Sequence, residues 1–333
     1  MDRSRVNAHS GRLEAAGRNV RSCALAGAFL AAMAGTALAQ GPSRVDCATA
    51  ATPIERTICA KPELAAADRK MAAAYAALAG KLTGAAKDHL LADQIRWLAN
   101  RAAACVVDPA EMEECLESRD RDRTAQLEWL GEGAYPFVSE QAIVRTGKVR
   151  GIPYIIDASY PQFDAGTADF SAVNRQIVST TSEAADRVVP GPDADNDGGN
   201  YGGPPWRYEQ AFALYKPGPN AVSVKIAYGA YEGGAHGIVG VTGMLVDLRT
   251  GKVVGPEGVF LPTSNWLREL TRIVSADINT PNLADILKQP QRYVFLEDRL
   301  ELSFNQYEGG PYTVEIPYDR LRPLLRADGL VPR

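Results

Sequence analysis

The fold of the N-terminal part is decided by residues 46–60, DCATAATPIERTICA, and residues 94–105, QIRWLANRAAAC. With Cys115, these stretches place two cysteine pairs on either side of an alanine-rich segment. Apolar side chains recur in that segment at intervals of three and four, at Leu64, Met71, Tyr75, Leu78 and Leu82. This period is typical of an amphipathic helix. The pattern from Asp46 to Cys115 therefore predicts a small all-α hairpin bracketed by cysteines.

Start and stop signals predict three helices here. Pro62 suits the first turn of the first helix, and Gly84 falls where that helix should end. A second helix is expected over about residues 87–104 and a third over about residues 110–130, because Pro109 breaks the helical pattern between them. The third helix contains a charged run, residues 119–123 with the sequence RDRDR, which is typical of a solvated helix face.

Asp68 falls on the apolar stripe of the first helix. A buried carboxylate needs a partner, and Arg101 on the antiparallel neighbour is the expected donor. Gln94 and the Trp97 indole are available for further hydrogen bonds. The alternative is that Asp68 acts as a general acid or base, but no second carboxylate or histidine shares the required spacing. We therefore predict a structural polar network of Asp68, Gln94, Trp97 and Arg101.

The first 39 residues predict export. Five arginines precede an apolar run from Ala24 to Leu38, which ends in the small-residue motif Ala37-Leu38-Ala39. This is the pattern of a signal peptide, residues 1–39, cleaved after Ala39, and it indicates a periplasmic or secreted protein. An uncleaved anchor is the alternative, but a membrane helix needs about 20 apolar residues, and this run is shorter.

Four cysteines follow the predicted cleavage site: Cys47, Cys59, Cys105 and Cys115. An even number in an exported chain favours disulfides. Four cysteines allow three connectivities, and we favour Cys47 with Cys59 and Cys105 with Cys115 because both pairs close short local loops. A zinc site is the competing interpretation, which the absence of a C-x-x-C pair and the oxidising compartment disfavour.

The helical part resembles a known family. Its motifs are Asp46-Cys47, the run 52–55 (TPIE) leading to Ile58-Cys59, the pattern Gln94-x-x-Trp97-Leu98-x-x-Arg101, and Cys105. These residues look like the N-terminal domain of the LprI type of lysozyme inhibitor, over about residues 40–132. The resemblance implies a small exported helical domain associated with lysozyme inhibition.

The composition changes after Leu130. Gly131, Gly133 and Pro136 mark a linker, which we place at residues 133–146. Short runs rich in Val, Ile, Tyr and Phe then predict strands at 154–160, 210–215, 222–228, 239–248 and 299–304. Helices are expected at 170–187, 265–278 and 318–325. Few connections are long enough for a βαβ crossover, so residues 147–333 are expected to form a second, α+β domain with a mainly antiparallel sheet.

This second part also resembles a known family. The segment 228–237, YGAYEGGAHG, the strand to Asp247-Leu248, and the later motifs 304–308, Pro311-Tyr312 and 316–318 look like the C-terminal domain of the RsiV type, over about residues 145–333. The same domain occurs in PdaC-type peptidoglycan deacetylases. The resemblance implies lysozyme recognition. This sequence lacks the sigma-binding segment, the transmembrane helix and the deacetylase domain, so neither signalling nor deacetylation carries over.

The Gly-rich segment is the predicted contact loop. Glycines around one histidine allow positive φ and close backbone approach to a partner. We hypothesise that Tyr231, Glu232, Gly233, Gly234 and His236 contact the cleft of a lysozyme, where a histidine or tyrosine could hydrogen-bond to catalytic carboxylates. The alternative is that these residues only brace a turn.

One motif suggests calcium. Asp193, Asp195 and Asp197, followed by Gly198, match the first half of an EF-hand loop. However, Pro204 stands where the bidentate glutamate should be, so a solvated loop is the favoured interpretation. We expect no cofactor and no metal.

The sequence shows little sign of enzyme machinery, and nothing in it selects a catalytic pair of carboxylates. After residue 39 the only histidines are His89 and His236, and there is no G-x-S-x-G, P-loop or dinucleotide motif, which favours a non-enzyme.

Loss of residues 1–39 lowers Lys+Arg from 36 to 31 and Asp+Glu from 40 to 38, leaving a net charge near −7. Such a chain disfavours nucleic acid and suits a basic protein.

Two functions remain. The first is a binding protein that inhibits or sequesters lysozyme. The second is a peptidoglycan-binding module of the cell envelope, whose aromatic residues Tyr201, Trp206 and Tyr208 would stack on sugars.

Overall fold

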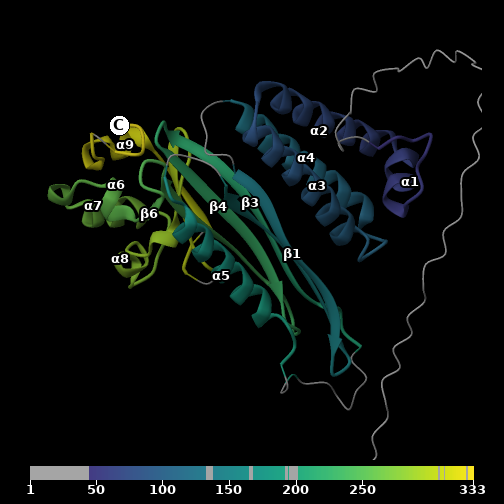
Figure 1. Ribbon diagram of the computed structural model, residues 1–333. Coiled ribbons are helices and arrows are strands. Elements are labelled where there is room, and N and C mark those ends of the chain that lie inside the picture. The colour runs from purple at the N-terminus through teal and green to yellow at the C-terminus, as the bar shows by residue number, and fades with distance from the viewer. Residues whose placement is uncertain are drawn as a thin grey trace, which may run out of the picture. The chain divides into compact units, whose positions relative to one another are not determined.

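The structure is a computed structural model that describes residues 45–132, 138–164, 168–191, 194, 202–306, 308–310, 312–327 and 329–333 (Figure 1). These residues belong to one compact unit, Gly41–Arg333. The predicted signal peptide and its cleavage site lie outside the described residues. Among the described residues, no helix combines the length and the apolar character needed to cross a bilayer.

The N-terminal part is helical, as the periodicity predicts. Its helices are α1 (Pro53–Ala60), α2 (Pro62–Lys81), α3 (Ala85–Cys105) and α4 (Met112–Gly131). A capping box of Thr52 and Glu55 begins α1, and the Glu55 carboxylate accepts from the Thr52 backbone N–H at 2.8 Å. Gly84, with φ +58°, precedes α3 in a conformation that glycine adopts without strain.

Both favoured disulfides are confirmed. Cys47 is bonded to Cys59 and Cys105 to Cys115, with 5.5 Å between the Cα atoms in each bridge. The zinc interpretation is therefore wrong, because all four thiols are committed to covalent bonds. The first bridge ties the segment before α1 to the last turn of that helix, and the second joins the end of α3 to the start of α4.

A six-stranded sheet follows in the order β1 to β6, with α5 (Ser171–Arg187) between the second and third strands. The strands are β1 (Val138–Val149), β2 (Ile152–Phe163), β3 (Trp206–Gly218), β4 (Ala221–Tyr231), β5 (Ile238–Asp247) and β6 (Lys252–Val254). Every neighbouring pair is antiparallel except β2 with β3, which α5 connects. This confirms the prediction of a mainly antiparallel sheet. Figure 1 shows α5 and helices α2–α4 on opposite sides of it.

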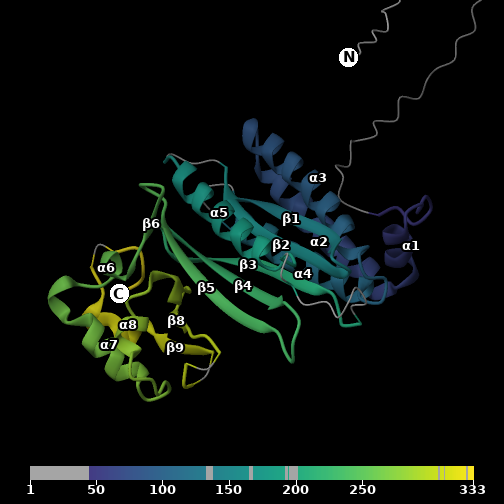
Figure 2. The same cartoon turned by 90° about the horizontal axis from the view of Figure 1, so that it is seen from below.

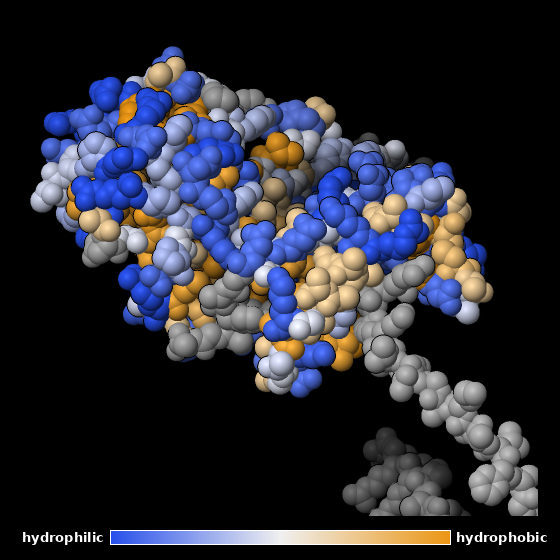
Figure 3. Space-filling view, turned by 90° about the horizontal axis from the view of Figure 1, so that it is seen from above, coloured by the Kyte–Doolittle hydropathy of each residue, from blue (hydrophilic) through white to orange (hydrophobic). Residues whose placement is uncertain are grey.

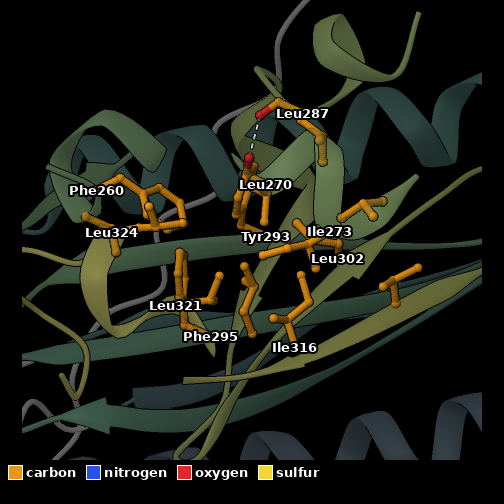
Figure 4. Packing of buried hydrophobic residues seen from close by; sticks show 14 of the residues in the cluster. Phe260, Leu270, Ile273, Leu287, Tyr293, Phe295, Leu302, Ile316, Leu321 and Leu324 are labelled. Carbon is orange, nitrogen blue, oxygen red and sulfur yellow. Dashed lines mark hydrogen bonds between the residues drawn. The ribbon is translucent and has the colours of Figure 1, made fainter. Parts of the chain in front are cut away.

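The C-terminal end forms a second, smaller assembly, seen from below in Figure 2. It contains a sheet of β7 (Tyr293–Phe295), β8 (Arg299–Ser303) and β9 (Thr313–Pro317), with the short helices α6 (Pro256–Val259), α7 (Trp266–Val274), α8 (Leu283–Ile286) and α9 (Tyr318–Leu321). Single 3₁₀ turns lie at Pro262–Ser264, Pro290–Arg292 and Arg322–Leu324. In its core, the Tyr293 hydroxyl donates to the Leu287 carbonyl, as Figure 4 shows.

The helices and the main sheet share one hydrophobic core. Trp97, Leu127 and Leu130 of the helices belong to the same buried cluster as Val138 of β1 and Leu214 of β3.

In Figure 3, hydrophilic side chains cover most of the face in view, and hydrophobic ones show in smaller patches. The division into a helical domain and a sheet-containing domain stays a prediction, because the two parts are packed together.

The structure differs from the sequence expectations at the proposed linker, residues 133–146. Strand β1 begins at Val138, so residues 138–146 belong to the sheet, and residues 133–137 lie outside the described part. Much of β1 is only half buried and carries Gln141, Arg145 and Lys148, which is why it lacks the apolar signal of a strand. Strands β6, β7 and β9 were also not expected; they are only three to five residues long.

Candidate functional site

A groove of about 900 Å³ lies between α4 and one face of the main sheet. Helix α4 supplies one wall, with Glu114, Ser118 and Asp122, and the segment after β8 contributes Phe304 and Tyr312. Strands β1 to β5 supply the floor. Because the helical part and the sheet both line it, the groove exists only where the two are packed together.

The strand register explains why the floor is hollow. Asp157, Glu209, Gly229 and Val239 are successive partners across β2 to β5, so their side chains lie in one row on one face. A second row contains Ala211, Ala227 and Val241. Glycine and alanine at the centre of both rows leave space above the sheet. No other heavy atom would lie within 4 Å of a Cβ at Gly229.

The groove is acidic toward α4. Six carboxyl groups and two guanidinium groups are among the described residues that line it; they are Glu111, Glu114, Asp122, Glu140, Asp157, Glu209, Arg119 and Arg207. Arg207 pairs with Glu111 at 2.9 Å and with Glu209 at 2.8 Å. Arg119 pairs with Asp157 and lies 3.9 Å from Glu140. The acidic groups outnumber the two guanidinium groups even with Glu140 left out, so this side favours cations.

Glu140 is the most buried acid of the groove, with 7% of its surface exposed. Burial raises the pKa of Glu140 to about 7, although nearby Arg123 and Arg119 oppose the shift. The Glu140 side chain is therefore partly protonated near neutral pH, and in that form it can donate as well as accept a hydrogen bond.

The predicted polar network is assembled beneath this wall. Asp68 Oδ1 lies 3.2 Å from Arg101 Nη1, and the Arg101 guanidinium lies 5.1 Å from the centre of the Trp97 ring. Gln94 Oε1 accepts from Arg123 Nε at 3.2 Å, and Gln94 Nε2 donates to the Met71 sulfur at 3.1 Å. The four side chains are thus buried close together, with Asp68 and Arg101 paired as predicted, whereas Gln94 pairs with Arg123 and Met71 instead of Asp68.

The solvated-face interpretation of residues 119–123 is wrong for two of its members. Asp120 and Arg123 are buried, and Asp120 Oδ1 lies 2.5 Å from Arg101 Nη1. Arg123 Nη2 lies 2.5 Å from Asp93 Oδ2. Burial raises the pKa of Asp120 to about 6 and also raises the pKa of Asp93. The missed signal was the helical stripe on which Asp120 and Arg123 alternate with apolar residues, Leu116 and Leu127.

Residues 46–127 match the family model of the lysozyme inhibitor LprI. No curated relative matches the chain. Two solved structures of DUF3298 family proteins resemble it. One, from Pseudomonas aeruginosa PAO1, is 18% identical with a TM-score of 0.43, covering 60% of this chain and 98% of its own. The other, from Bacteroides fragilis NCTC 9343, is 17% identical with a TM-score of 0.37, covering 58% and 94%. The resemblance to the RsiV and PdaC types stays a prediction.

The LprI domain therefore supplies one wall of the groove, and the sheet supplies its floor. The predicted contact loop joins β4 to β5, the strands whose residues Gly229 and Val239 lie on that floor. Gly233 and Gly234 have φ values of +84° and +95°, and the Tyr231 hydroxyl donates to the Gly234 carbonyl at 3.1 Å. His236 is exposed, with Nδ1 3.1 Å from the Gly237 carbonyl oxygen. The loop therefore adjoins the groove, but its residues are not among those that line it.

The sugar-stacking prediction fails for Tyr208. Tyr208 is 4% exposed and packs against Ile156 and Val188, on the face of the sheet that α5 covers. A ring at this depth cannot serve as a platform for sugars. Trp206 is half buried in the same cluster, and Tyr201 lies outside the described residues.

The calcium candidates Asp193, Asp195 and Asp197 also lie outside the described residues. Within the described ranges, no group of three or more His, Cys, Asp or Glu side chains is arranged to hold a metal ion.

Proposed function

We propose that this chain is an exported, non-enzymatic protein that binds lysozyme and inhibits or sequesters it, protecting the cell wall. The observation that carries the proposal is the match of residues 46–127 to the LprI lysozyme inhibitor family. Two disulfides in a domain of this size support an oxidising, extracytoplasmic location.

The charge distribution supports a basic partner such as lysozyme. The chain without residues 1–39 carries a net charge near −7, and the groove beside the LprI domain concentrates carboxylates on one surface. Opposite charges on two partners accelerate their encounter and disfavour wrong orientations. An acidic groove presented to a basic enzyme meets this requirement.

The test is a lysozyme turbidity assay beside a peptidoglycan pull-down. The chain from residue 40 onward is mixed with c-type, g-type and i-type lysozymes, and lysis of a bacterial suspension is followed. Slower lysis with at least one class, together with a measurable affinity by calorimetry, is expected. An acidic protein of similar size without an LprI domain serves as the control. Undiminished lysis and no binding to any class would contradict the proposal, and retention on peptidoglycan alone would favour an envelope-binding module.

A further inference from the structure

The groove offers an open space that the fold itself does not fill. Its floor is made of the smallest side chains available, Ala211, Ala227 and Gly229, while larger residues lie at both ends. A Cβ at Gly229 would meet no other heavy atom within 4 Å, so the fold leaves this position open. The space lies beside a well-packed part of the core. Trp97 belongs to that core, lines the groove and is only 1% exposed. A surface of this kind can admit a segment of another protein.

Charge is distributed unevenly along the groove. At the α4 side, Glu114 is exposed and has no ion pair among the described residues. Asp122 lies 3.7 Å from the adjacent Arg121 and accepts a hydrogen bond from Ser118 at 3.5 Å. The guanidinium of Arg207 is already shared between Glu111 and Glu209. These carboxylates are largely solvated, so a cation that approaches them gains attraction without a large desolvation penalty.

The opposite side of the groove is apolar. Val239 is 54% exposed and lies on the floor, with Val241 beside it, and Tyr312 is 49% exposed on the facing wall. Large apolar side chains exposed together next to a cleft are typical of an interaction surface. The groove therefore has an acidic half and an apolar half.

We infer that this groove is the docking surface of the protein, and that its occupant is a cationic segment of a basic protein partner. Lysine or arginine side chains of the segment lie toward Glu114, Asp122 and Glu209, and its apolar side chains cover Val239 and Val241. The inference deepens the proposed function, on which it rests for the identity of the partner.

The steric test is Gly229→Leu. A Cβ at this position meets no other heavy atom within 4 Å, and the rest of the leucine side chain extends from it into the groove. We expect affinity for lysozyme to fall at least about tenfold, because the segment can no longer reach the floor. The matched control is Gly80→Leu in α2, where a Cβ also meets nothing within 4 Å and the residue is exposed. Circular dichroism and thermal melting establish that both variants fold. Equal affinity of the two variants would overturn the inference.

The electrostatic test compares Glu114→Lys with Glu117→Lys. Both residues are exposed on α4 and both changes alter the net charge equally, but only Glu114 lines the groove. We expect association with lysozyme to be about tenfold slower for Glu114→Lys than for Glu117→Lys at low salt. The difference should shrink between about 50 and 500 mM salt, as the charges are screened. Identical rates would show that the groove does not meet the cationic segment.

A second probe separates the inference from the proposed function. If no lysozyme binds the unsubstituted chain, the proposed function fails, and the same variants are titrated with a labelled oligo-arginine peptide. Binding that Gly229→Leu and Glu114→Lys weaken would sustain the groove as a site for cationic segments. No binding, or binding that these changes leave unaltered, would overturn it. Self-association abolished by Gly229→Leu would also overturn it, because a second copy would then be the occupant.

Discussion

The carboxylate of Asp93 in α3 accepts a hydrogen bond from the backbone N–H of Glu140 in β1, with 3.0 Å between Oδ1 and N. The other oxygen of Asp93 lies 2.5 Å from Arg123 Nη2 in α4. One buried side chain therefore ties two helices of the LprI domain to the first strand of the sheet. The groove depends on this contact between the helices and β1, because α4 forms a wall of the groove and the sheet forms its floor.

Asp93→Asn should destabilise the protein by about 3–5 kcal/mol, because it leaves the buried guanidinium of Arg123 without its carboxylate. Urea unfolding followed by circular dichroism measures the change. The control is Asp285→Asn, which removes an exposed pair with Lys288 and should cost less than about 1 kcal/mol. Equal costs for the two variants would show that the junction is not held by Asp93.

Glu140 should make stability depend on pH. Burial raises the pKa of its carboxyl from 4.5 to about 7, so between these values the folded chain holds a proton that the unfolded chain has lost. The free energy of unfolding therefore falls as the pH rises through this window, by about 3 kcal/mol in total at about 1.4 kcal/mol per pKa unit. The contribution is complete below about pH 4.5 and is lost above about pH 7.

The variant Glu140→Gln isolates this effect, because the amide stays neutral at every pH. Urea unfolding of both proteins between about pH 5 and pH 8 should show the wild type losing stability relative to the variant as the pH rises. Asp120, whose pKa burial raises to about 6, titrates in both proteins and cancels from the difference. A difference that does not change with pH would mean that Glu140 is ionised throughout.

The disulfides close loops with sequence separations of 12 and 10 residues. Replacement of one bridge, as in the double variant Cys105→Ser and Cys115→Ser, should cost about 2–3 kcal/mol, chiefly because the unfolded chain gains freedom. Thermal melting under non-reducing conditions measures the loss. The matched variant with Cys47→Ser and Cys59→Ser should lose a similar amount. Unchanged melting of either variant would assign its bridge no role in stability.

Two glycines of the main sheet should differ in how well they tolerate alanine. At Gly243 a Cβ would collide with the carbonyl oxygen of Tyr293 in β7, so Gly243→Ala should destabilise by about 2–3 kcal/mol. At Gly229 a Cβ meets open space, so Gly229→Ala should change stability by less than about 0.5 kcal/mol. Chemical denaturation of both variants measures the change in the free energy of unfolding. A tolerated Gly243→Ala would mean that β5 and β7 approach less closely than the structure shows.

His236→Ala tests the contact role proposed for the β4–β5 loop. If the imidazole hydrogen-bonds to a lysozyme carboxylate, affinity should fall about tenfold without a change in melting temperature. Calorimetry with several lysozymes measures it, with Tyr231→Phe as a companion that removes the hydrogen bond to Gly234. Unchanged affinity for every lysozyme would reduce the loop to a braced turn.

Local signals predicted local structure well. The apolar period of Leu64, Met71 and Tyr75 predicted a helix, and the short cysteine separations predicted both disulfides. Strand β1 was missed because its half-buried polar residues give no apolar run, and its place in the sheet depends on pairing with β2. The burial of Asp120 and Arg123 was missed because a charged run has the same composition whether water or another helix faces it.

The sequence by itself predicted the helical hairpin, favoured the correct disulfides and showed the resemblance to LprI, because each depends on residues close together in the chain. Only the tertiary structure decided the groove. Its floor aligns Asp157 with Glu209 and Gly229 with Val239 through strand register, and its wall brings Glu114 from a separate helix. The tertiary structure also decided the raised pKa of Glu140, because it depends on burial and on charged residues that are distant in the sequence.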